Sequence, residues 1–229
     1  DSDAIRRFFK DTTPDLLRKW FNEDIQSWFK SKRVYQKEGL FILDQSHLVV
    51  PDNPNYKGAV KMPVDEHGQW YRNDKKLTKE QKYTHPLHPC YTFSSLLHIN
   101  EDKDHFHISG YEFDPGNEDE LVQARKLVFN FCEKYPGIIK ELIVDRGYID
   151  GQFLGKVKKD YDVDILIPLK SNMDDYKDSI EIAKRLDKWE ITEFKKRRNG
   201  ELIKETKTTL VKDMDLWPEC SVKLHTYVS

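Results

Sequence analysis

Two aspartates, Asp44 and Asp145, each follow a short apolar run of the chain. Asp145 comes after Leu142-Ile143-Val144, and Asp44 comes after Gly39-Leu40-Phe41-Ile42-Leu43. Apolar runs of this length predict buried strands, so each aspartate is expected where its strand ends at the edge of a sheet. Two carboxylates brought together at one edge repel each other unless a cation lies between them.

Such a pair of carboxylates suits hard divalent cations such as Mg²⁺. Two such ions about 4 Å apart activate a water or hydroxyl group and stabilise the leaving oxygen during phosphodiester cleavage. The alternative is that each aspartate only begins a turn or caps a helix. A zinc site around His85, His88 and Cys90 is not predicted, because their spacing fits no standard finger and no second ligand pair is obvious.

The elements expected around these aspartates are a hairpin, alternating strands and helices, and a β-rich tail. The hairpin is expected over 91–99 and 105–113, helices over 118–134, 149–159 and 172–186, and a buried strand over 163–169. The order β-ββ-α-β-α-β-α predicts an α/β fold in which a mixed sheet carries helices on its faces. An N-terminal helical segment over 1–37 precedes this core, and short β-rich pieces over 189–229 follow it.

Composition limits the protein class without deciding it. The chain has 229 residues and a net charge of -2, with 34% charged residues, so its surface carries both signs. A chain of this length can bury a proper core. No apolar run approaches the ~20 residues of a membrane-spanning helix. The first residues, Asp1-Ser2-Asp3, are acidic and lack a methionine, so we expect an excised piece of a longer protein and no secretory signal.

Three blocks of the chain resemble IS4-type DDE transposases in order and spacing. Leu43-Asp44-Gln45-Ser46 is similar to their first-aspartate block, and Asp145-Arg146-Gly147-Tyr148 with the segment 165–172 is similar to the second. Between them, Pro115-Gly116-Asn117-Glu118-Asp119 resembles the family's Pro-Gly-Asn turn. The resemblance implies a ribonuclease H-like core over 38–188 and two Mg²⁺ or Mn²⁺ ions, one of them shared by Asp44 and Asp145. It also implies an enzyme that cuts and joins DNA at transposon ends.

The third acid of such a site is missing from its family pattern. In these transposases a final glutamate lies on a helix after a β-rich insertion, within Tyr-x-x-Arg-x-x-x-Glu, and this chain contains no such pattern. We expect that glutamate beyond Ser229, with 189–229 as the start of the insertion. Glu181, 36 positions after Asp145, is an alternative metal ligand that suits the spacing of other DDE enzymes, although a solvated helix position is the favoured interpretation. Without its third acid the chain is expected to bind metal weakly and to leave DNA uncut.

Basic residues near these blocks are candidates for DNA contacts. Arg146 can bind a phosphate as a forked donor, and Lys195, Lys196, Arg197 and Arg198 form a basic run at a hairpin tip. The partners implied by the resemblance are transposon ends, target DNA and further copies of the chain. The location it implies is the cytoplasm of a prokaryote, in association with the nucleoid. Two other functions remain open: a non-catalytic DNA-binding or dimerisation remnant, and another ribonuclease H-like nuclease that uses Glu181.

Overall fold

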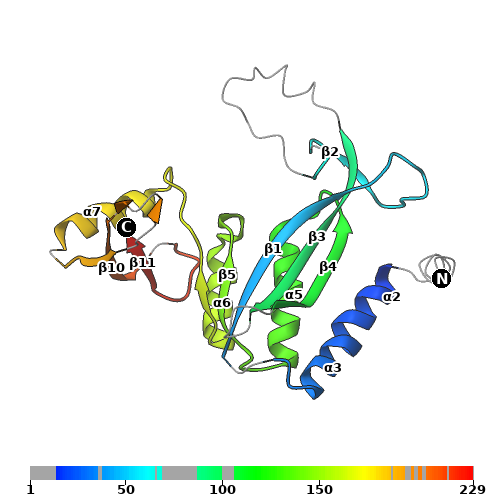
Figure 1. Cartoon of the computed structure of the whole chain (residues 1–229), viewed down its shortest axis with the longest axis horizontal. Coiled ribbons are helices and arrows are strands. Elements are labelled where there is room, and N and C mark those ends of the chain that lie inside the picture. Colours follow the sequence, from blue (N-terminus) through cyan, green and yellow to red (C-terminus); the bar gives the residue numbers. More distant parts are fainter. Residues whose placement is uncertain are drawn as a thin grey trace.

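The computed structural model of the chain has a curled mixed sheet at its centre, with helices packed on it (Figure 1). It describes residues 14–35, 38–64, 66–68, 87–99, 106–186, 188–193, 197–198, 201–202, 205–215 and 217–228. Within these residues, no helix is long and apolar enough to cross a membrane.

The central sheet is organised around β1 (Gly39–Val49). β3 (His88–Ile99) pairs antiparallel with one edge of β1, and β5 (Ile139–Val144) pairs parallel with the other. Three strands extend the sheet on either side: β6 (Asp164–Leu166) beside β5, and β4 (Phe106–Pro115) and β2 (Val60–Met62) beside β3. The order β4-β3-β1-β5-β6, with β3 antiparallel to both of its neighbours, is consistent with a ribonuclease H-like fold.

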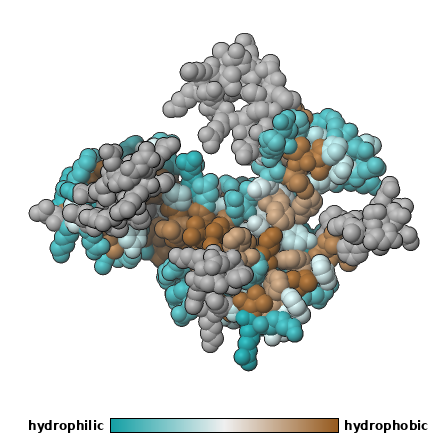
Figure 2. All heavy atoms as spheres, in the orientation of Figure 1, coloured by the Kyte–Doolittle hydropathy of each residue, from teal (hydrophilic) through white to brown (hydrophobic). Residues whose placement is uncertain are grey.

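Two helices cover the sheet and close the hydrophobic core. α5 (Glu120–Lys134) and α6 (Gly151–Tyr161) begin at aspartate caps, because Asp119 and Asp150 each accept a backbone N–H of the first turn at 2.7 Å. Apolar side chains of both helices pack against those of β1 and β5, and the buried set includes Phe41, Leu43, Leu142, Val144, Leu127, Val128, Phe131, Phe153, Leu154 and Val157. In Figure 2, hydrophobic residues gather in the middle of this face, around β5.

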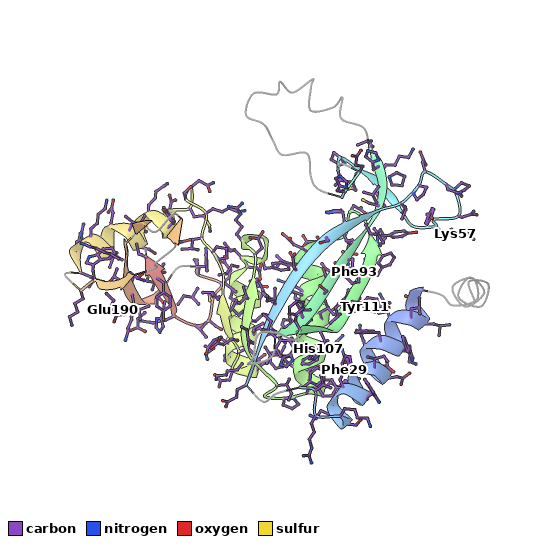
Figure 3. All side chains as sticks on the ribbon, viewed as in Figure 1. Phe29, Lys57, Phe93, His107, Tyr111 and Glu190 are labelled. Carbon is purple, nitrogen blue, oxygen red and sulfur yellow. The ribbon has the colours of Figure 1, made fainter. Side chains whose placement is uncertain are left out.

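The N-terminal helical segment packs along β4. It runs through α2 (Pro14–Lys19), the π-helical turn η1 (Trp20–Ile25) and α3 (Gln26–Ser31). The Asn22 side chain bonds both backbone groups of Tyr111, at 2.8 and 3.0 Å, and so occupies the free edge of β4. Phe29 lies with its ring centroid 5.3 Å from that of His107, a contact between labelled residues in Figure 3.

A smaller β-rich unit follows the core. It contains α7 (Asp174–Arg185), a sheet of β7 (Glu190–Glu193), β10 (Glu205–Met214) and β11 (Leu224–Val228), and the short pair β8 (Arg197–Arg198) and β9 (Glu201–Leu202). Trp217, Cys220 and Leu224 pack against the main core and so connect this unit to it. Figure 1 shows α7 beside β10 and β11, apart from β1.

Most predicted elements are present, and two expectations about strands are wrong. β1 does not end at Asp44 but continues to Val49, because its second half remains paired with β3 as far as Val49 and Cys90. The strand expected over 163–169 is short and lies at the sheet edge, where Leu166 is 59% exposed. Pro168 cannot donate to a ladder, which limits how far this strand extends. The part of the predicted N-terminal helix before Pro14 lies outside the described residues.

Candidate active site

The ladder between β1 and β5 places Asp44 beside Asp145. Leu43 is paired with Val144 in parallel register, so Asp44 is the next residue of β1 and Asp145 directly follows β5. Neighbouring strands lie about 4.8 Å apart, which brings two carboxylates to the carboxyl end of β5. Leu43 and Val144 are buried, whereas Asp44 and Asp145 are exposed, so the hydrophobic pairs fix the register and leave the acids accessible.

The electrostatics of Asp44 reflect this neighbour. Desolvation raises the pKa of the Asp44 carboxyl, although the residue as a whole is exposed. The backbone N–H of Gln45 donates to Asp44 Oδ1 at 2.9 Å, and this hydrogen bond lowers the pKa of Asp44. The negative charge of Asp145 raises that pKa further. A divalent cation near both groups would favour their ionised forms.

A groove beside the two aspartates joins all three sequence blocks. Its volume is about 340 Å³, and its walls include Gln45 from the first block, Gly116 from the Pro-Gly-Asn turn and Gly147 from the second block. Gly116 donates its amide to the Cys90 carbonyl at 3.1 Å, and a Cβ at position 116 would lie 2.6 Å from Cys90 Sγ. Glycine therefore lets the turn lie directly on β3.

A buried glutamine on α5 connects the strands under this groove. Gln123 Oε1 accepts from Gln45 Nε2 at 2.8 Å and from the Ser94 hydroxyl at 2.5 Å. Gln123 Nε2 donates to Asp114 at 2.9 Å and to the Thr92 hydroxyl at 3.1 Å. A carboxylate such as Asp114 only accepts, so it fixes which way the Gln123 amide points. Gln45, the residue after Asp44, is held in place by this network.

A third carboxylate, Glu120, lies at the same groove. Burial raises the pKa of the Glu120 carboxyl, and the negative charges of Asp119 and Asp145 raise it further. The positive charge of Lys170 opposes that rise, and the charge of Asp44 adds to it. Glu120 was not predicted from the sequence. The signal available was its place at the first position of α5, directly after the Pro-Gly-Asn turn.

The family model described as the transposase DDE domain matches residues 35–218, which is more than half of the chain. The chain belongs to the transposase DDE domain family. No curated protein matches it. The family consists of enzymes that cut and join DNA, and DDE transposases generally use divalent metal ions.

The carboxylates of Asp44 and Asp145 in this DDE domain could supply some of the ligands of a divalent metal ion. Asp44 and Asp145 supply carboxylate oxygens, which Mg²⁺ and Mn²⁺ prefer, and Mg²⁺ is commonly bound through one or two carboxylates with water completing its shell. In the part of the chain that the structure describes, no group of three or more His, Cys, Asp or Glu side chains is close enough to hold an ion directly. The carboxylates that the β1–β5 register brings together are those of Asp44 and Asp145.

The other predicted site residues do not all lie near the aspartate pair. Glu181 is exposed on α7, in the unit that Figure 1 shows apart from β1, and it is not among the charges that shift the pKa of Asp44. Arg146 is exposed in the turn η2 (Arg146–Tyr148), directly after Asp145. Lys195 and Lys196 lie outside the described residues, as do the side chains of the two arginines of β8.

Proposed function

We propose that this DDE domain cuts and joins DNA at transposon ends, with Asp44 and Asp145 as the two aspartates of its active site. The observation that supports the assignment is the parallel register of β1 and β5, which brings these residues to adjacent positions at the carboxyl end of β5. The family match supports DNA cleavage and transfer as the reaction class. The subtype that the three blocks resemble is that of IS4-type elements.

The two aspartates would hold Mg²⁺ or Mn²⁺, and a pair of such ions would activate water and stabilise a leaving oxygen. The first reaction is hydrolysis of a phosphodiester, which breaks a P–O bond and leaves a 3′-hydroxyl at the transposon end. In the second, that hydroxyl attacks a phosphodiester of target DNA in line and releases a new 3′-hydroxyl. Asp44 and Asp145 hold and orient the reacting groups, and the Gln45–Gln123 contact fixes the strand that carries Asp44.

DNA is the proposed partner, bound by further copies of the chain that assemble on the transposon ends. Arg146 is positioned to meet a phosphate beside Asp145, because it is exposed and directly follows it. The basic run from Lys195 to Arg198 is a second proposed contact with the DNA backbone. The reaction would take place in the bacterial cytoplasm, where the chromosome lies.

The test is movement of a marked transposon in cells that express the transposase. Asp44→Asn and Asp145→Asn should each reduce transposition to the level of a strain without transposase, while circular dichroism of the purified variants stays native. Asp160→Asn is the matched control, because Asp160 is exposed on α6 and pairs only with Lys156 across one helical turn, at 3.7 Å, among the described residues. Normal transposition by either active-site variant would overturn the assignment.

A further inference from the structure

Glu120 reaches the aspartate pair from a different element, across a glycine. Asp44 and Asp145 belong to the sheet, whereas Glu120 is the first residue of α5. The Glu120 carboxylate lies against Gly147, two residues after Asp145, and a Cβ at position 147 would overlap Glu120 Oε1 and lie 2.6 Å from Glu120 Cδ. The glycine thus lets an acid from α5 approach the turn that begins at Asp145.

A buried hydroxyl points to a ligand in the same place. Tyr148 is 1% exposed, and its hydroxyl has no hydrogen-bond partner among the described residues. Burial raises the pKa of Tyr148, and the negative charges of Glu120 and Asp44 raise it further, as does that of Asp145. The hydroxyl therefore lies within the field of all three carboxylates.

The Ser94 hydroxyl lies near that of Tyr148 and lowers its pKa, but no hydrogen bond of good geometry joins the two. The Ser94 hydroxyl donates instead to Gln123 Oε1 at 2.5 Å. A buried polar group without a partner is destabilising, because it has lost its hydrogen bonds to water. A phenolic hydroxyl can both donate and accept, so an ordered water molecule of a hydrated cation is a ligand that would use it.

We propose that Glu120 is a third carboxylate of the cation site, which holds the ion through one of its bound water molecules. The inference rests on the proposed function, since Asp44 and Asp145 are the direct ligands. Mg²⁺ and Mn²⁺ fit this arrangement, because Mg²⁺ keeps several waters when it binds to protein carboxylates. Glu120 is thus a positioning residue for a metal-bound water.

The experiment is a titration of the chain with Mn²⁺, followed by isothermal calorimetry and by the electron paramagnetic resonance of free Mn²⁺. Glu120→Gln should weaken Mn²⁺ binding by about 10-fold or more, the usual effect of losing a group that supports a metal ligand. Glu133→Gln is the matched control, since Glu133 is an exposed glutamate near the other end of α5. It removes the same charge and should leave the affinity for Mn²⁺ unchanged.

Gly147→Ala provides a second variant that keeps Glu120. Its new methyl group displaces the Glu120 carboxylate, so Mn²⁺ binding should weaken although no charge is lost. In a Glu120→Ala background the same methyl group meets no carboxylate, and Gly147→Ala should then have no further effect. This non-additivity distinguishes a positioned carboxylate from general damage to the turn.

The outcomes separate the two proposals. If Asp44→Asn and Asp145→Asn weaken Mn²⁺ binding and Glu120→Gln does not, the role of Glu120 is wrong and the active site stands. Equal losses for Glu120→Gln and Glu133→Gln would also overturn it, because they would show only an effect of net charge. If the wild-type chain binds no Mn²⁺, or if both aspartate variants bind it unchanged, the proposed active site itself fails.

Discussion

Gln45 on β1 donates its side-chain amide to Gln123 Oε1 on α5, at 2.8 Å. Gln123 is fully buried, and the four hydrogen bonds of its side chain reach β1, β3 and β4. The helix and three strands are therefore fixed relative to one another directly beneath the residue that follows Asp44. The position of Asp44 on β1 therefore depends on a polar contact as well as on the hydrophobic pairs of the β1–β5 ladder.

Replacing Gln123 by leucine should destabilise the fold by about 2–4 kcal/mol. The change leaves Ser94 and Thr92, both buried, without one hydrogen-bond partner each, and each such group costs about 1–3 kcal/mol. Urea unfolding followed by fluorescence measures the loss. Gln152→Leu on the exposed side of α6 is the control and should change stability by about 0.5 kcal/mol or less. Equal stability of the two variants would show that the network contributes nothing.

The variant Glu181→Gln tests the alternative that the chain is another ribonuclease H-like nuclease with Glu181 as its third acid. We expect Glu181→Gln to leave transposition within about twofold of wild type, because Glu181 is exposed on α7 and α7 packs with β10 and β11. The measurement is the same marked-transposon assay, with Asp145→Asn as the inactive reference. A loss as complete as that of Asp145→Asn would instead make Glu181 the third acid of the site.

The aspartate pair could be predicted from the sequence because each aspartate directly follows a short apolar run, and such runs form buried strands. Apolar runs such as Leu142-Ile143-Val144 fix a strand, and two such strands in parallel register carry their next residues to the same place. The sequence could not show how far β1 continues beyond Asp44, since the residues from Gln45 to Val49 mix polar and apolar types. Their pairing with β3 decides that they remain extended.

Glu120 was missed for a different reason. Its position depends on how closely the start of α5 approaches the turn after Asp145, and this distance is set by the missing side chain of Gly147. Hydrophobic periodicity places Leu127 and Phe131 of α5 on the core, but it carries no information on what the first turn of the helix meets. Acids that converge through helix placement are thus harder to predict than acids that follow strands.

The burial of β5, which pairs with β1, predicts how substitutions on this strand change the stability of the fold. Leu142→Ala on β5 should cost about 2–5 kcal/mol, because Leu142 is completely buried between the sheet and its helices. Leu166→Ala on the neighbouring β6 should cost about 0.5 kcal/mol or less, since that side chain is 59% exposed. Thermal and urea unfolding of the two variants compare the same chemical change on adjacent strands. A similar cost at both positions would contradict the burial of β5.

The last prediction concerns acid stability and the buried His98. Its Nδ1 lies 3.3 Å from His107 Nε2, its ring packs on Phe41 at 4.7 Å, and its Nε2 has no partner among the described residues. Burial lowers the pKa of His98 from 6.5 to about 4, and the neighbouring His107 contributes to the decrease. Below pH 6.5 the unfolded chain binds a proton that the folded chain does not. The stabilisation is therefore present above the unfolded pKa and is lost as the pH falls toward the folded one.

Between pH 7.5 and pH 5 this linkage should remove about 2 kcal/mol from the free energy of unfolding. His98→Phe removes the titrating group and supplies a ring for the contact with Phe41, so the loss of stability over the same pH range should be smaller by about that amount. Urea unfolding at the two pH values gives the difference directly. His67→Gln is the control, because His67 has a side chain that is 77% exposed, and it should retain the wild-type pH dependence. If His98→Phe also retains it, the acid sensitivity arises from other groups, and His98 is protonated in the fold as readily as in the unfolded chain.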